Sequence, residues 1–280
     1  MFIKKFANLL LCVFILLMTI SPDTPRTAIP VNTQSTVYKL YILMYHGFTQ
    51  STKESEYVIR SEKLEDDIIY LKNNGYNFIN IQDLLQFSDG KKILSEKNVM
   101  LTFDDGYLNN YSYAFPILKK HNVKAVISPI GYYVDFYTKN PDSNPNYAQL
   151  SIKEIKEMHQ SGLVEFQNHS YNMHSLENRK GSLPMKNEFT QKYIREFYYD
   201  LKCAETLIKE ATGQKPDAYT YPFGMISDES RKILESCGYR VSLGCEEGVN
   251  RIAGGKRNFF NLKRFNRTPQ RGAVYFTTHY

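Results

Sequence analysis

The chain alternates short apolar runs with longer stretches in which apolar residues recur at helical spacing. Residues 38–45 (YKLYILMY) and 99–103 (VMLTF) are nearly continuous apolar and aromatic runs, a pattern typical of strands buried on both faces. Between them, residues 61–74 follow a helical period, and Gly75 then ends the stretch. The pattern therefore predicts strand, helix and strand in this part of the chain.

The same alternation continues to about residue 237. Further strands are predicted over 77–79, 125–129, 164–167 and 218–221, and further helices over 81–87, 110–121, 151–160, 190–212 and 227–237. Alternating strands and helices predict a parallel sheet, and this many units favour a closed barrel over an open sheet. We expect an α/β fold, a distorted (β/α) barrel of about seven parallel strands in one domain over residues 38–280, with its chemistry where strands end.

The N-terminus has the pattern of an export signal. Lys4 and Lys5 precede an apolar run over 9–18, which is shorter than the roughly 20 residues of a membrane-spanning helix. No A-x-A cleavage site follows, so the segment can also remain as an anchor. We predict a signal peptide or N-terminal anchor over 1–22 and a linker over 23–37. The expected location is secreted or extracytoplasmic, with association with the cell envelope or membrane through this segment.

Composition narrows the classes of function. The chain is 42% hydrophobic and 23% charged, which suits one folded domain. Its net charge of +6 comes from scattered Lys and Arg, so no nucleic-acid partner is predicted. After the leader, Cys203, Cys237 and Cys245 are an odd number, which argues against a full disulfide framework, although the last two could pair. No CxxC pair is present, so a thiolate zinc site is not expected.

Two acidic residues follow the predicted strand over 99–103 directly. Asp104 and Asp105 precede Gly106, which allows a sharp turn, so both carboxylates are presented at the end of the strand. Adjacent acids repel each other unless a cation or a proton separates their roles. An ordinary turn is the alternative, because Asp and Gly are common in turns.

Two histidines follow the predicted strand over 164–167. His169 and His174 are neutral-imidazole donors of the kind that Zn²⁺ prefers, and two His with one carboxylate leave a coordination position open for water. A hydrolase needs that open position. The alternative is a pair of hydrogen-bonded structural histidines. Together the two motifs predict a metal site at the strand ends of the barrel.

These residues match the motifs of a known family. The TFDDGY sequence over 102–107 and the pair His169 and His174 resemble the first two motifs of the polysaccharide deacetylases of carbohydrate esterase family 4, the NodB-homology domain. The resemblance runs from about Leu40 to Asn266, and the histidine spacing is similar to that of the poly-N-acetylglucosamine deacetylase branch. It implies a catalytic domain that removes N-acetyl groups from a cell-surface polysaccharide, either poly-N-acetylglucosamine, peptidoglycan or a chitin-like polymer.

The resemblance also implies roles for individual residues. Asp105, His169 and His174 would hold one divalent metal ion, zinc, and Asp104 would be the general base. The Tyr-Pro-Phe-Gly turn at Phe223 resembles the third motif of the family, so the Phe223 N–H would stabilise the developing oxyanion. An ordinary Pro-Gly bend is the alternative for this turn.

Two departures from the family pattern change the expected assignments. The third-motif arginine that orients the base is replaced by Thr220, and Arg264 is a candidate substitute because a guanidinium can bind a carboxylate with two bonds. A solvent-facing Arg264 is the alternative. The late L-x-x-H motif is not found upstream of the C-terminal tail, but Leu-Met-Tyr-His over 43–46 fits it. Since the first and last strands of a closed barrel are neighbours, His46 is predicted as the general acid.

Aromatic side chains are candidates for binding sugar rings. The chain has 22 Tyr and 17 Phe and no Trp. Tyr107, Tyr132, Tyr133 and Tyr171 lie near predicted strand ends, where packing is the alternative role; only Tyr107 is predicted as a substrate contact. Two rival functions stay open, an inactive carbohydrate-binding wall protein and a metal-dependent O-acetyl esterase.

Overall fold

The computed structural model of this protein describes residues 36–280. The predicted signal peptide or anchor over 1–22 lies outside this range, as does all but the end of the predicted linker over 23–37. No helix within residues 36–280 combines the length and the apolar character that crossing a bilayer requires.

Strands and helices alternate along most of the described chain. The strands are β1 (Tyr38–Tyr45), β2 (Gly47–Thr49), β3 (Val58–Arg60), β4 (Asn77–Phe78), β5 (Lys97–Asp105), β6 (Ala125–Pro129), β7 (Val164–Phe166), β8 (Ala218–Thr220), β9 (Val241–Leu243), β10 (Asn250–Ile252), β11 (Phe259–Leu262) and β12 (Phe265–Asn266). The helices are α1 (Ser61–Asn73), α2 (Ile81–Ser88), α3 (Phe115–His121), α4 (Gly131–Lys139), α5 (Ile152–Gln160), α6 (Thr190–Thr212), α7 (Asp228–Ser236) and α8 (Ala273–His279), with a π-helical turn (Asn110–Ala114) and a 3-10 turn (Pro222–Gly224).

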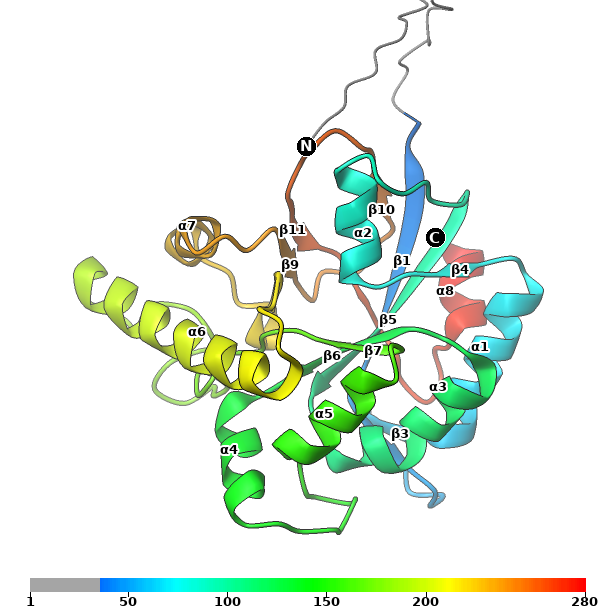
Figure 1. The fold of residues 1–280 in the computed structure, drawn as a ribbon, viewed down its shortest axis with the longest axis horizontal. Helices are drawn as coiled ribbons and strands as arrows, with labels where there is room; N and C mark the ends of the chain where they lie inside the picture. Colours follow the sequence, from blue (N-terminus) through cyan, green and yellow to red (C-terminus); the bar gives the residue numbers. More distant parts are fainter. Residues whose placement is uncertain (1–35) are drawn as a thin grey trace, which may run out of the picture. The chain divides into compact units, whose positions relative to one another are not determined.

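The parallel strands form a ring. β1, β5, β6 and β7 pair in that order, and β8, β9 and β11 form a second parallel set. A bridge between Asn168 and Tyr219 joins β7 to β8, and β12, which follows β11, pairs in parallel with β1. With β11 and β12 counted as one position, seven parallel positions therefore close on themselves, as predicted. Helices α1, α3 and α5 pack on the outer side of the strands (Figure 1). One strand, β10, departs from this order because it pairs with β1 antiparallel.

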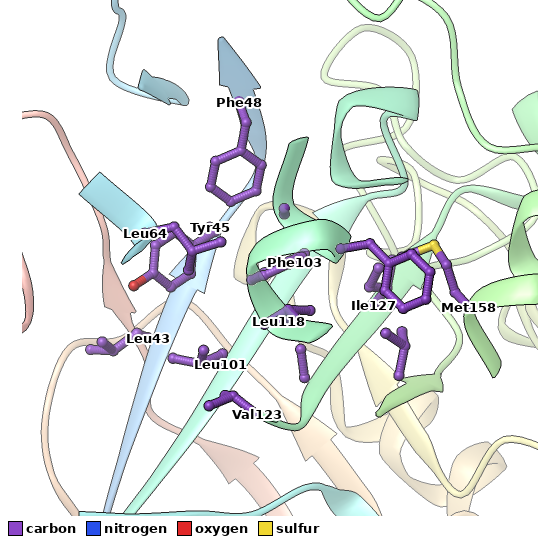
Figure 2. Packing of buried hydrophobic residues seen from close by; sticks show 14 of the residues in the cluster. Leu43, Tyr45, Phe48, Leu64, Leu101, Phe103, Leu118, Val123, Ile127 and Met158 are labelled. Carbon is purple, nitrogen blue, oxygen red and sulfur yellow. The ribbon is translucent and has the colours of Figure 1, made fainter. Parts of the chain in front are cut away.

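Alternate residues of the strands supply two cores. Leu40 and Ile42 of β1 pack with Met100, Val126 and Leu243 from other strands, which fills the inside of the barrel, and α2 contributes to the same cluster. Tyr41, Leu43 and Tyr45 point the other way, because successive side chains of a strand face opposite sides. Figure 2 shows this outer core, in which strand residues Leu101, Phe103 and Ile127 meet Leu64 of α1, Leu118 of α3 and Met158 of α5.

Most of the predicted elements are present, and those that were missed have weak patterns. The strands over 38–45 and 125–129 and the helix over 190–212 have the predicted bounds. The predicted helix over 110–121 is a π-helical turn followed by α3. Strands β2, β3 and β9 to β12 were not predicted, because two to four residues carry too little periodicity, and the short helix α8 was not predicted either. Helix α4 was also missed, because its aromatic and β-branched residues favour strands.

Cysteine pairing does not contribute to this fold. Cys203, Cys237 and Cys245 are all free in the described part of the chain, so the disulfide considered for the last two is not formed.

A buried ion pair ties the C-terminal segment to α1. Asp67 of α1 accepts hydrogen bonds from Arg267 Nε at 2.5 Å, from the Tyr45 hydroxyl at 2.9 Å and from the Ala273 backbone N–H at 2.8 Å. The side chains of Asp67 and Arg267 are 6% and 5% exposed. Removing one partner of such a pair leaves an uncompensated buried charge, which is strongly destabilising.

We therefore expect Asp67→Ala to lower the free energy of unfolding by about 3–5 kcal/mol, because Arg267 would stay buried without a carboxylate. Urea denaturation measures the change. Asp66→Ala is the matched control, since Asp66 is the preceding residue of the same helix and is exposed; we expect a change within about 0.5 kcal/mol for it. Equal losses in the two variants would contradict the assignment.

Candidate active site

A cluster of three potential metal ligands lies at the carboxyl ends of β5 and β7, two strands of the barrel with β6 between them. Asp105 is the last residue of β5, and His169 and His174 lie in the segment that follows β7. One ligand atom from each lies within 4.8 Å of the other two. The distances from Asp105 Oδ1 are 3.4 Å to His169 Nε2 and 3.2 Å to His174 Nε2. Carboxyl ends of parallel strands share one edge, so residues far apart in sequence meet there.

The backbone at this edge adopts conformations that L-residues rarely take. Asp105, Ser170 and Phe223 all have positive φ, at 67°, 70° and 56°. Gly106 follows with φ of 79°, and a Cβ there would lie 2.5 Å from Pro129 Cβ, so a side chain is excluded. Strained backbone of this kind costs about 1–3 kcal/mol per residue and gathers at functional sites.

The orientation of His169 suits a cation. Its Nδ1 lies 2.8 Å from the carbonyl oxygen of Thr220. A carbonyl only accepts hydrogen bonds, so Nδ1 carries a proton, which leaves Nε2, on the side of Asp105, as the nitrogen that can bind a cation. Burial opposes ionisation of Asp105, but the two imidazoles outweigh it and hold the pKa of that carboxyl well below its usual range. Two nitrogens and a carboxylate oxygen with this convergence fit a divalent cation.

Asp104 makes a bidentate ion pair with Arg264. Oδ1 accepts from Nη1 and Oδ2 from Nη2, each at 2.8 Å. Arg264 is 0% exposed, so it is not the solvent-facing residue of the alternative interpretation. Its Nε also donates to the Gly244 carbonyl at 2.7 Å. Burial alone would raise the pKa of Asp104, but the charge of Arg264 outweighs burial and lowers it, so Asp104 is held ionised.

The position that lacks the expected arginine has another set of contacts. The Thr220 hydroxyl lies 2.7 Å from the Ser128 hydroxyl, and the Thr220 carbonyl holds His169. The backbone at position 220 therefore orients the histidine, while Arg264, which lies between β11 and β12, contacts the carboxylate of Asp104.

These groups line one cavity of about 560 Å³. His46, Tyr107 and Phe223 line it together with Asp104 and the three potential metal ligands, so all the predicted site residues except Arg264 reach the cavity wall. Arg264 lies behind Asp104. Five further lining residues were not singled out from the sequence, namely Met44, Tyr57, Leu176, Cys245 and Asn266.

Two aromatic contacts shape the cavity. The His46 ring meets the Tyr57 ring edge-on, with centroids 4.9 Å apart, and the Phe223 ring lies 4.4 Å from that of His174. Burial lowers the pKa of His46, although Asp104 and Asp105 oppose the shift. Burial, reinforced by Asp105, raises the pKa of Tyr107 to about 12, so its hydroxyl keeps its proton.

The other tyrosines noted from the sequence do not reach this cavity. Tyr132 and Tyr133 lie on the exposed face of α4, and Tyr171 lines a neighbouring cavity. Tyr107 is thus the only one of the four among the lining residues of the catalytic cavity.

Asp200 of α6 anchors the loop that carries both histidines. Its two carboxylate oxygens accept the backbone N–H groups of Tyr171 at 2.8 Å and Asn172 at 2.6 Å. Burial raises the pKa of Asp200 to about 6, against the effect of these N–H donors. The sequence carries a signal for this residue, since Asp200 interrupts the apolar stripe of Tyr193, Phe197 and Ala204 on α6.

Fold and site together define a (β/α) barrel protein with a site for a divalent cation. The family model described as polysaccharide deacetylase matches residues 91–242, more than half of the chain. The chain therefore belongs to the polysaccharide deacetylase family, and this confirms the resemblance found in its motifs.

Similar proteins include a poly-β-1,6-N-acetyl-D-glucosamine N-deacetylase of Staphylococcus aureus, which is 26% identical over 201 residues. That match covers 71% of this chain and 65% of the relative, so it spans somewhat less than two thirds of the curated protein. Among solved structures, a de-N-acetylase from Aggregatibacter actinomycetemcomitans has a TM-score of 0.72 at 23% identity, covering 86% of this chain and 99% of that one. IcaB from Ammonifex degensii has a TM-score of 0.67 at 26% identity, covering 83% and 93%. These similarities support the barrel fold.

The anchoring of the histidine loop yields a testable expectation. We expect Asp200→Ala to weaken binding of a divalent cation by about 10–100-fold, because Tyr171 and Asn172 lose the acceptor that fixes the loop. Isothermal titration with Zn²⁺ measures the affinity. Asp135→Asn is the control, since Asp135 bonds the hydroxyl of Tyr171 and not its backbone. An unchanged affinity in Asp200→Ala would show that the loop is held without this carboxylate.

Proposed function

We propose that this protein is a zinc-dependent hydrolase that removes N-acetyl groups from a poly-N-acetylglucosamine chain of the cell envelope. The observation that carries the proposal is the convergence of Asp105, His169 and His174 beside the ionised carboxylate of Asp104 in one open cavity. The choice of polymer is supported by the name of the staphylococcal relative. The choice of zinc is supported by the donor set, two imidazole nitrogens and one carboxylate oxygen.

The proposed reaction is the hydrolysis of an amide. The bound cation supplies Lewis-acid activation of water and of the amide carbonyl. Asp104 accepts a proton from the attacking water as the new C–O bond forms. Arg264 fixes the orientation of Asp104 and keeps it charged, so the base has its proton-accepting form across the neutral range.

The remaining residues stabilise the developing oxyanion and protonate the departing amine. The Phe223 backbone N–H donates to the oxygen of the former carbonyl, and its left-handed φ of 56° sets the direction of that peptide. His46 donates a proton to the amine nitrogen as the C–N bond breaks. The products are acetate and a free amine on the sugar. Tyr107 lies beside the reacting groups and contacts the sugar.

We further propose that the chain is exported and stays associated with the envelope through residues 1–22. The basic and apolar pattern of this segment supports the proposal. Recovery of the chain exclusively from the cytoplasm of fractionated cells would contradict it.

Acetate release tests the proposed function. We expect the purified protein to release acetate from poly-N-acetylglucosamine, to lose this activity on removal of metal by a chelator, and to regain it with Zn²⁺. Asp104→Asn should lower kcat by about 10²–10⁴-fold, because the general base is lost. Bound metal and circular dichroism show whether the variant folds, since Arg264 loses its charged partner.

Different outcomes lead to different conclusions. Release that is independent of metal, or full activity of Asp104→Asn, would reject the mechanism. Faster release from O-acetylated than from N-acetylated sugars would favour the esterase, and bound metal without release from either would favour a carbohydrate-binding protein.

His46 is tested separately. We expect His46→Ala to lower kcat by about 10²–10⁴-fold at unchanged metal content, because the departing amine loses its proton donor. The control is His121→Ala, since His121 lies outside the cavity and pairs with Glu65 at 2.6 Å. If His46→Ala turns over at the wild-type rate, another group protonates the amine.

A further inference from the structure

A second concave surface adjoins the loop that carries the histidines. His174 and Leu176 line the catalytic cavity, whereas Met173 and Ser175, which alternate with them, line a neighbouring cavity of about 590 Å³. One stretch of chain thus forms a wall of both cavities. A ligand long enough to pass over this loop would contact both at once.

This surface continues along α6. A further cavity of about 420 Å³ shares Tyr171 and Tyr199 with the one beside the loop. Both volumes lie within the range of about 300–1,000 Å³ that is typical of ligand clefts. We call the two cavities together the α6 groove, whose shared walls are Tyr171 and Tyr199.

Exposed aromatic side chains gather at the α6 groove. Tyr199 is 71% exposed although it is large and partly apolar. Tyr132 of α4 is also exposed, and its ring centroid lies 6.5 Å from that of Tyr171. Tyr133 packs edge-on against Tyr132. Gathered exposed aromatics with polar neighbours indicate a binding surface, because each ring offers an apolar face and a hydrogen-bonding tip.

The charges in the groove point to an uncharged polar ligand. Both carboxylates and cations line it, including Asp135, Glu196, Arg195 and Lys202. Nucleic acid would need a surface of predominantly positive charge. A chain of N-acetylated sugars instead offers apolar ring faces for the tyrosines and hydroxyl and amide groups for both kinds of charged side chain.

We propose that the α6 groove binds a second segment of the same acetylated sugar chain whose reacting unit occupies the catalytic cavity. This proposal rests on the proposed function for the identity of the ligand. The groove makes the protein selective for long chains over short ones, because a short oligomer in the catalytic cavity does not reach Tyr171 and Tyr199.

The test compares two adjacent tyrosines of α6. Tyr199→Ala removes a groove wall, and Tyr198→Ala is the matched control, since Tyr198 is 49% exposed but lines neither cavity. We expect Tyr199→Ala to raise KM for long poly-N-acetylglucosamine about tenfold at unchanged kcat, and to leave KM for the disaccharide unchanged. Tyr198→Ala should leave all of these constants unchanged.

Binding decides the proposal independently of turnover. In the metal-free full chain, we expect Tyr199→Ala to weaken binding of the long polymer about tenfold in affinity electrophoresis, relative to Tyr198→Ala. That result supports the groove even if no acetate is released, in which case only the proposed function fails. Equal behaviour of the two variants toward the long polymer, or an equal rise in KM for the disaccharide, would overturn the groove.

Discussion

The buried pair of Arg264 and Asp104 is the contact on which the site depends. Asp104 belongs to β5, whereas Arg264 lies between β11 and β12, 160 residues later. Both are removed from water, so neither charge is tolerated without the other. The pair forms only if β12 lies beside β1, which closes the ring of parallel strands. Closure of the barrel therefore also brings Arg264 to Asp104, which keeps that carboxylate ionised.

The site also requires that strained backbone conformations be held in place at the ends of the strands. Asp105, Ser170 and Phe223 have left-handed conformations within one cavity region, and each is flanked by residues with fixed contacts. Ser170 precedes the two N–H groups held by Asp200, and the carbonyl that orients His169 belongs to Thr220, just before the turn at Phe223. The surrounding packing therefore bears the cost of conformations that place Asp105 and Phe223 on the wall of the cavity.

The chain departs from the family pattern in the residue that supplies the guanidinium, but the contact between a guanidinium and Asp104 is kept. With threonine at 220, the guanidinium comes from Arg264 and the Thr220 hydroxyl bonds that of Ser128, while the backbone carbonyl of Thr220 orients His169. Bidentate geometry depends on where the guanidinium ends and not on which strand supplies it. The α6 groove lies next to this site, because the loop that carries the two histidines also lines the groove.

By itself the sequence determined the local elements and the chemical groups. Long apolar runs and helical periods predicted β1, β6 and α6, and the DDG and histidine motifs predicted Asp105, His169 and His174 as a group. The short strands β9 to β12 carried too few residues to be recognised. Only the tertiary structure decided that Arg264 contacts Asp104, that Asp200 anchors the histidine loop, and that Tyr107 but not Tyr171 lines the catalytic cavity. These contacts join residues that lie far apart in the sequence. No local pattern predicts them, because such residues meet only when the barrel closes.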